Sequence, residues 1–137
     1  MMIRGINMGC DIHCYMEIKI NGKYYYAGTM TRFRNYFIFS MLSGVRSEGD
    51  DEEAYFPTDC DMPEDCCDEI KIAYERWGED AHTLTIISNA HLVLDNFIKE
   101  RLQQDDAHFV ENWNKACKGV SSCLGFETVR LVMWYDN

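Results

Sequence analysis

Apolar and polar residues alternate along the stretch Cys10-Asp11-Ile12-His13-Cys14-Tyr15-Met16-Glu17-Ile18-Lys19-Ile20. Successive side chains of a β-strand point to opposite faces, so this period predicts a strand with one apolar face. Asn21-Gly22 follows directly and is a strong signal for a two-residue hairpin turn. We therefore expect Tyr24 to Thr29 to return as the paired strand of a hairpin.

Signals for helices and strands continue through the middle of the chain. The segment from Asn35 to Ser43 is apolar and ends at Gly44, which suits a helix closed by a left-handed cap. Pro63 opens a predicted helix that runs to about Trp77 and stops at Gly78. The segment from His82 to Ile87 is short and rich in β-branched residues, so it predicts a strand.

The last third of the chain predicts two helices and a final strand. We expect, in order, a helix over 89–103, a helix from 105 or 106 to about 117, a loop over 119–122 and a buried strand over 127–135. Ser88 suits the cap of the first helix, and Asp105 or Asp106 suits the cap of the second. The first of these helices is expected to bury Leu92, Phe97, Ile98 and Leu102.

Hairpin strands together with clustered helices favour an α+β fold over a doubly wound one. We expect a single domain over residues 8–137, with a mainly antiparallel sheet, three to four helices and a solvated acidic loop over 47–62. The length of 137 residues and the hydrophobic fraction of 47% fit this expectation. A chain of this size buries roughly two-thirds of its unfolded surface.

The chain is strongly acidic, with 23 acidic and 13 basic residues and a formal net charge of −10. Non-specific nucleic-acid binding draws its affinity from Lys and Arg against phosphates, so this charge argues against it. The charge also disfavours binding to anionic membranes. A small phosphorylated ligand stays compatible with it, because two or three local arginines suffice to bind one.

Seven cysteines is an odd number, so they cannot all pair within one chain. Residues 1–7 lack the apolar core and cleavage site of a signal peptide, and free thiols are typical of a reducing cytoplasm. We therefore expect a cytoplasmic protein. Cys10 and Cys14 fall on the apolar face of the first strand, whereas Cys60, Cys66 and Cys67 lack the paired spacing of a zinc knuckle.

Two Asp-x-His pairs are the candidate chemical groups: Asp11 with His13, and Asp80 with His82. In an extended strand, residues i and i+2 point to the same face, so each pair presents a carboxylate beside an imidazole. These are ligands of zinc, manganese or iron and are groups that transfer protons. The alternatives are an exposed first pair, a turn cap at Asp80 and a core histidine at His82.

A third copy of the Asp-x-His spacing, Asp106-Ala107-His108, tests how specific this spacing is for a functional site. It falls at a predicted helix start, where residues i and i+2 diverge around the helix and do not readily share a ligand. We interpret Asp106 as a helix cap and His108 as incidental. The spacing therefore has limited specificity.

The segment Thr31-Arg32-Phe33-Arg34-Asn35-Tyr36 leads into the first predicted helix. Arg32 and Arg34 fall near the helix N-terminus, where backbone N–H groups and the helix dipole favour an anion. Together with Asn35 and Tyr36 they form a candidate ligand-binding group, and Arg46 is a weaker member. The alternative is that Asn35 only caps the helix and Arg34 pairs with an acid.

These motifs together resemble a family of small proteins encoded by bacteriophages and prophages. Members begin Met-Gly-Cys-Asp-Ile-His, matched here by residues 8–13, and share an Arg-Asn-Tyr, matched by residues 34–36. Looser matches follow at 61–65, where Asp61 stands for the family's glycine, at 80–83, where Thr83 stands for serine, and at 129–136. The resemblance runs from Met8 to the end and implies that residues 1–7 are an extension. It implies a phage accessory protein in the cytoplasm of a bacterial host, with counter-defence as a role.

Three functional hypotheses follow. The first is a metal-dependent phosphoesterase in which Asp11, His13, Asp80 and His82 hold one or two divalent metals, zinc or manganese, and activate water. Arg34, with Arg32, would neutralise the phosphate of a nucleotide-like substrate. The second is a non-enzymatic protein that sequesters such a nucleotide signal or inhibits a host defence protein through its acidic surface. The third is a structural or assembly protein; the Tyr24-Tyr25-Tyr26 run suits self-association into a homo-oligomer.

Overall fold

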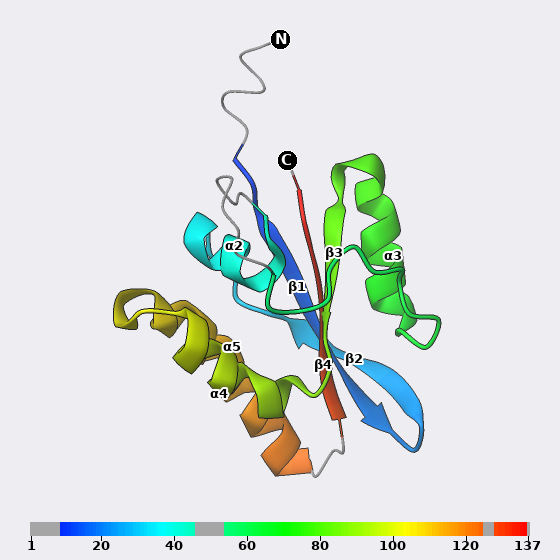
Figure 1. Cartoon of the computed structure of the whole chain (residues 1–137). Coiled ribbons are helices and arrows are strands. Elements are labelled where there is room, and N and C mark those ends of the chain that lie inside the picture. Colours follow the sequence, from blue (N-terminus) through cyan, green and yellow to red (C-terminus); the bar gives the residue numbers. More distant parts are fainter. Residues whose placement is uncertain (1–8, 46–53, 125–127, 137) are drawn as a thin grey trace.

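The structure is a computed structural model that describes residues 9–45, 54–124 and 128–136. In chain order its elements are β1 (Ile12–Ile20), β2 (Lys23–Thr29), α2 (Tyr36–Ser43), α3 (Asp68–Trp77), the 3-10 turn η1 (Gly78–Asp80), β3 (His82–Ile87), α4 (Ala90–Arg101), α5 (Gln104–Leu124) and β4 (Thr128–Tyr135). The four strands form one sheet in the order β2-β1-β4-β3, and every pair is antiparallel. The expected α+β fold with an antiparallel sheet is confirmed (Figure 1).

Helices cover both faces of this sheet. On one face, the apolar residues of β1 pack with α2, α4 and α5 around Phe39, Leu94 and Trp113. On the other face, Trp134 of β4 packs with Ile70 of α3 and with Cys66 and Cys67 before it. Figure 1 shows α3 on one side of the strands and α2, α4 and α5 on the other. The polar side of β1 is therefore enclosed by α3 and the loop before it.

The predicted hairpin is confirmed. Strands β1 and β2 pair from Ile20 with Lys23 back to Tyr15 with Thr29, and Asn21 and Gly22 form the turn between them. Both turn residues have a positive φ, 51° at Asn21 and 81° at Gly22. A two-residue turn that matches the twist of the strands needs this backbone conformation, and Asn and Gly adopt it readily.

Helix α2 begins and ends where the sequence predicts. Asn35 caps it by accepting a hydrogen bond from the Ile38 amide at 3.1 Å. Gly44 closes it with a φ of 73° and donates its amide to carbonyls of the last turn. The Asn35 amide group also donates to Oδ1 of Asp106 in α5 at 3.0 Å. Asn35 therefore both starts α2 and ties it to α5.

Several predicted boundaries were wrong. Helix α3 begins at Asp68 rather than at Pro63, because residues 63–66 form a turn in which the Cys66 amide donates to the Pro63 carbonyl at 3.1 Å. Helix α5 continues through the predicted loop over 119–122. Val120 packs against the core there, and this burial outweighs the low helix propensity of Gly119.

The start of α4 and the faces of α4 and α5 also differ from prediction. The N-cap of α4 is Asn89, in a left-handed conformation at φ 52°, rather than Ser88. Leu92 is 64% exposed, while Phe97 is buried. Helix α5 begins at Gln104, so Asp105 and Asp106 lie in its first turn instead of capping it, and Asp106 accepts a hydrogen bond from Asn35.

The expected acidic loop over 47–62 is described only from Ala54 onwards, and residues 46–53 lie outside the described ranges. Its described part is irregular and is held to the edge of the sheet. Thr58 forms a bridge to Thr85 of β3, and the Cys60 amide donates to the Leu84 carbonyl at 3.2 Å. In the part of the chain that the structure describes, no helix is long and apolar enough to cross a bilayer.

We predict that Asn35→Ala lowers the free energy of unfolding by about 1–2 kcal/mol, because it removes a helix cap and a bond to α5. Asn35→Ser is the matched control: its hydroxyl can still cap α2 but cannot reach Asp106. Urea denaturation should therefore place the serine variant between the wild type and the alanine variant. Equal stability of the two variants would show that the cap contributes nothing.

Candidate functional site

The residues of the opening motif meet the end of the chain. Because β1 pairs with β4, His13 lies opposite Trp134, and Asp136 follows directly after β4. Nε2 of His13 is 2.6 Å from Oδ2 of Asp136, and the Asp11 amide donates to Oδ1 of the same carboxylate at 3.2 Å. An ionised carboxylate only accepts, so this contact assigns a proton to Nε2 of His13. His13 is buried and its ring lies 4.5 Å from that of Trp77 in α3.

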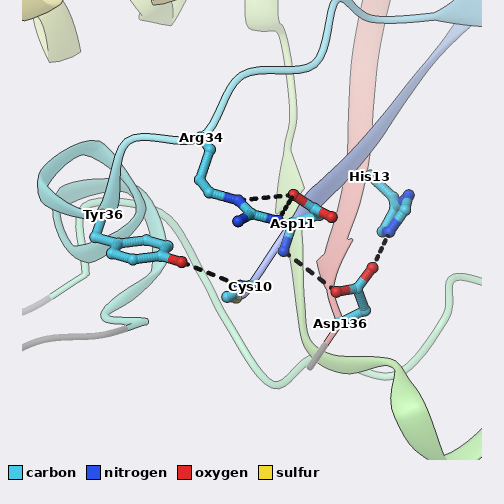
Figure 2. A network of polar contacts seen from close by, with 6 residues as sticks. All are labelled: Cys10, Asp11, His13, Arg34, Tyr36 and Asp136. Atoms are coloured by element: carbon cyan, nitrogen blue, oxygen red, sulfur yellow. Dashed lines mark hydrogen bonds and ion pairs between the residues drawn. The ribbon is translucent and has the colours of Figure 1, made fainter. Parts of the chain in front are cut away.

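Asp11 and Arg34 form the second half of this group. Nε and one Nη of Arg34 donate to Oδ1 of Asp11 at 3.0 and 2.8 Å. The pKa of Arg34 is raised by this hydrogen bond and by the charge of Asp11. The Tyr36 hydroxyl accepts from the Cys10 amide at 3.3 Å. Figure 2 shows the whole group, which we call the motif network: Cys10, Asp11, His13, Arg34, Tyr36 and Asp136.

Gly9 is part of the same arrangement. A Cβ atom at this position would overlap the guanidinium group of Arg34. A side chain at residue 9 would therefore force the guanidinium end of Arg34 to move from its present position beside Asp11. The absence of a side chain at Gly9 is therefore compatible with the close approach of Arg34 to this part of the backbone.

The two Asp-x-His pairs are not brought together. His13 faces α3, whereas His82 pairs with Tyr135 in the sheet, and its ring lies 6.2 Å from the Tyr135 ring. Tyr135 belongs to the opposite face, where it packs against Phe39 of α2. Among the described residues, Asp11, His13, Asp80 and His82 do not gather into a group of three or more ligands. Tyr135 pairs with both His82 and Ile12, and Ile12 is the neighbour of His13 in β1. Because neighbouring residues of a strand point to opposite faces, His82 and His13 lie on opposite faces of the sheet.

The second pair lies at the strained end of β3. Asp80 is exposed in η1, and Nδ1 of His82 is 2.9 Å from the Thr83 hydroxyl. Thr83 has a φ of 58°, an uncommon conformation for a β-branched residue, and the register of β3 shifts between His82 and Thr85. The bulge, rather than a simple strand, orients this pair.

Three of the remaining predicted ligand-binding residues make hydrogen bonds within the fold. Asn35 caps α2, Arg34 pairs with Asp11, and Tyr36 bonds to Cys10. Arg32 is exposed on the segment before α2. Arg46 lies outside the described residues.

A second polar group lies on the same face of the sheet, further along β1. Glu17 and Arg130 stand opposite each other in the β1–β4 ladder, and both are buried. Nε of Arg130 donates to Oε2 of Glu17 at 2.6 Å, and one Nη donates to Asp65 at 2.9 Å. The guanidinium carbon lies 3.8 Å from the centre of the Tyr24 ring, a cation–π contact. Burial works against the charged guanidinium, but the two carboxylates raise the pKa of Arg130.

Two cysteines complete this second group. The other oxygen of Glu17, Oε1, accepts from the Cys67 amide at 2.9 Å, and the Cys66 and Cys67 thiols are buried beside the carboxylate. Burial and then the charge of Glu17 raise the pKa of the Cys66 thiol well above its usual value. Burial also raises the pKa of Cys67, to about 11. Both thiols therefore carry their protons at neutral pH in this state.

A cleft opens next to this group, between the β1–β2 hairpin and the start of α3. Its volume is about 480 Å³. One wall is formed by the hairpin residues Gly22, Lys23, Tyr24, Tyr25 and Tyr26, and the other by Glu64, Asp65, Cys66, Cys67, Asp68, Glu69 and Lys71. We call it the acidic cleft, because its four carboxylates outnumber its two lysines. Tyr25 and Tyr26 are 45% and 40% exposed.

Sequence reasoning missed Glu17, Arg130 and Asp136 as site residues, and it set Cys66 and Cys67 aside. Two signals were present. Arg130 is a charged residue inside the buried run 129–135, and a buried charge requires a partner. Glu17 lies on the same face of its strand as His13, so it was available as that partner. Nothing in the local sequence shows that residues 66 and 67 approach Glu17.

Searches of protein-family models, of curated proteins and of solved structures each found no match to this chain. The geometry of the motif network and of the acidic cleft therefore carries the functional argument.

We predict that Glu17→Gln lowers the free energy of unfolding by about 3 kcal/mol, since it leaves the Arg130 charge buried with one carboxylate fewer. The double variant Glu17→Met/Arg130→Met should lose less stability than Glu17→Gln, because it removes both charges. Asp95→Asn, which breaks the exposed pair with Lys118, is the control and should change stability little. Denaturant titration measures all three. A loss at Asp95 as large as that at Glu17 would contradict the buried-pair account.

We predict that Gly9→Ala displaces Arg34 and breaks its bonds to Asp11. Arg34→Ala should then change the thermal stability of the Gly9→Ala protein less than it changes that of the wild type. Gly119→Ala is the control: a Cβ atom there meets open space, and the variant should gain about 0.5–1 kcal/mol from helix propensity. Fully additive effects of Gly9→Ala and Arg34→Ala would show that the two residues are not coupled.

Proposed function

We propose that this protein acts by binding rather than by catalysis, and that its acidic cleft docks on a basic segment of a host protein. In this proposal it is a phage accessory protein with a counter-defence role in the bacterial cytoplasm. One observation carries the proposal. Carboxylates of the loop before α3 and of its first turn face the exposed tyrosines of the hairpin across a concave surface.

The chemistry of the cleft suits arginine or lysine side chains. Glu64, Asp68 and Glu69 are exposed, so their carboxylates are accessible to a partner cation. Tyrosine rings attract cations on their faces, and the cleft tyrosines already make such contacts: Nζ of Lys23 lies 5.3 Å from the Tyr25 ring, and the Arg130 guanidinium lies 3.8 Å from the Tyr24 ring. The net charge of −10 would steer a basic partner towards the protein.

The same features oppose a phosphorylated ligand in the cleft, because carboxylates repel phosphate. Arg34, the principal anion-binding candidate, already donates two hydrogen bonds to Asp11. The positive charge of Arg34 is therefore already partly balanced by Asp11, which weakens its attraction for a nucleotide phosphate. Sequestration of a nucleotide signal is supported less well than docking on a protein.

The metal-dependent phosphoesterase hypothesis also receives less support from this arrangement. It requires Asp11, His13, Asp80 and His82 to share one or two metals. His13 and His82 lie on opposite faces of the sheet, and His13 already contacts Asp136. Hydrolysis of nucleotides by the purified protein with added zinc or manganese, abolished by His13→Ala, would overturn the binding proposal.

We predict that a peptide of alternating arginine and glycine binds the protein, whereas the same peptide with citrulline in place of arginine does not. Asp68→Lys/Glu69→Lys should weaken arginine-peptide binding at least tenfold, because it replaces two attractive charges with repulsive ones. Glu79→Lys/Glu111→Lys, at exposed positions on η1 and α5 outside the cleft, makes the same change in charge and should weaken binding much less. Isothermal titration calorimetry at low and moderate salt measures each affinity.

Two results would count against the cleft as the docking site. Equal loss of affinity in the Glu79→Lys/Glu111→Lys variant would assign the interaction to overall charge rather than to the cleft. Equal binding of the citrulline peptide would remove the electrostatic basis altogether. Tyr25→Ala then separates the contribution of the tyrosine ring to the affinity from that of the carboxylates, since it removes a ring from the cleft and leaves the carboxylates in place.

A further inference from the structure

Three potential metal ligands meet behind the wall of the acidic cleft. The carboxylate of Glu17 and the thiols of Cys66 and Cys67 present ligand atoms that all lie within 4.8 Å of one another. All three residues are buried, with exposed fractions of 0%, 4% and 7%. Zn–S bonds of about 2.3 Å in a tetrahedral site separate sulfur ligands by about 3.8 Å, so the group needs to tighten by about 1 Å.

The Glu17 carboxylate is oriented as a metal ligand would be. The Cys67 amide donates to Oε1, and Nε of Arg130 donates to Oε2. Oε2 lies 2.6 Å from both Nε and one Nη of Arg130, whereas Oε1 keeps a second lone pair for a cation beyond its bond to the Cys67 amide. Hydrogen bonds of this kind fix the direction of a ligand and are common around protein metal sites.

Binding of a divalent cation would leave the net charge of this buried group unchanged. Two buried thiols lie beside the Glu17 carboxylate, whose negative charge is balanced by the positive charge of Arg130. When a divalent cation binds, both thiols become thiolates and release their two protons to solvent. Two positive charges leave and two arrive, so the net charge of this buried group does not change. Burial therefore adds no uncompensated charge.

We propose that Glu17, Cys66 and Cys67 bind one soft divalent cation, with zinc as the expected ion and a fourth ligand position open to the acidic cleft. Thiolates prefer zinc to magnesium, calcium or manganese. Three protein ligands with one open position are typical of zinc sites that admit water or a substrate group. Cys66 and Cys67 line the cleft, so this position faces its interior.

This site differs from the one that the sequence predicts, since it uses none of Asp11, His13, Asp80 and His82. It joins the middle of β1 to the loop before α3, two parts of the chain separated by about fifty residues. Metal binding would therefore fix the carboxylate-bearing wall of the cleft to the sheet. The site does not depend on the docking proposal, and the two can fail separately.

Cobalt(II) tests the proposal directly, because thiolate ligands give it an intense charge-transfer absorption that oxygen and nitrogen ligands do not. Titration of the reduced, metal-free protein should produce this absorption with an end point at one equivalent, and zinc should abolish it by displacing cobalt. Cys66→Ser and Cys67→Ser should each reduce the absorption, and the double variant should remove it. Cys60→Ser, in the same loop but outside the ligand group, is the matched control and should retain it.

A second measurement does not depend on the folding of any variant. One equivalent of zinc added to the wild-type protein should slow alkylation of Cys66 and Cys67 at least tenfold, as read by peptide mass spectrometry. The rate at the exposed Cys123 should not change. The proposal is overturned if cobalt gives no thiolate absorption, if the absorption survives in the double variant, or if zinc leaves both alkylation rates unchanged. Retention of the cobalt signal in the Asp68→Lys/Glu69→Lys protein would show that metal binding stands apart from docking.

Discussion

The register of β1 against β4 is the constraint on which the rest of the structure depends. The two strands pair from Ile12 with Tyr135 to Lys19 with Thr128, and this places the beginning and the end of the described chain side by side at the centre of the sheet. Both polar groups are consequences of that pairing. Glu17 faces Arg130 directly, and His13 reaches the carboxylate that follows β4. A slip by one residue would turn every side chain of one strand to the opposite face and break both contacts.

A buried ion pair, Glu17 with Arg130, lies within this register. Removing Glu17 and Arg130 from water is unfavourable, and their mutual attraction offsets it only with good geometry and further hydrogen bonds. The structure supplies these through the Cys67 amide, Asp65 and the Tyr24 ring. Apolar residues alone would tolerate more than one pairing of two alternating strands, whereas a buried carboxylate opposite a buried guanidinium tolerates one. We infer that the pair helps to select the native alignment.

The same pairing sets the positions of the acidic cleft and of the proposed metal site. Glu17 holds the amide of Cys67 and Arg130 holds Asp65, so the loop before α3 is fixed to the sheet at two points. That loop carries the carboxylates of the acidic cleft, and the hairpin across from it carries the tyrosines. The proposed docking surface and the proposed metal site thus share one wall. At the other end of β1, the motif network closes the opening motif against α2 and Asp136, which gives it a structural role whether or not it also acts on a ligand.

Local sequence was sufficient to predict the fold class and most elements, because alternation, turn residues and caps act over a few neighbouring positions. The hairpin at Asn21-Gly22, the helix between Asn35 and Gly44, and the strand at 82–87 were predicted for physical reasons that the structure bears out. Predictions were wrong where tertiary contacts decide: α3 starts late because the preceding loop folds against Glu17, and α5 continues past Gly119 because Val120 is packed. For the candidate site, too, local sequence determined one part and tertiary contacts determined the other. The sequence alone determined which side chains share a face of β1, since that depends on the period of the strand. Only the tertiary structure decided that His13 meets Asp136 and that Glu17 meets Arg130, Cys66 and Cys67, because contacts between residues so far apart in the chain depend on strand pairing and packing.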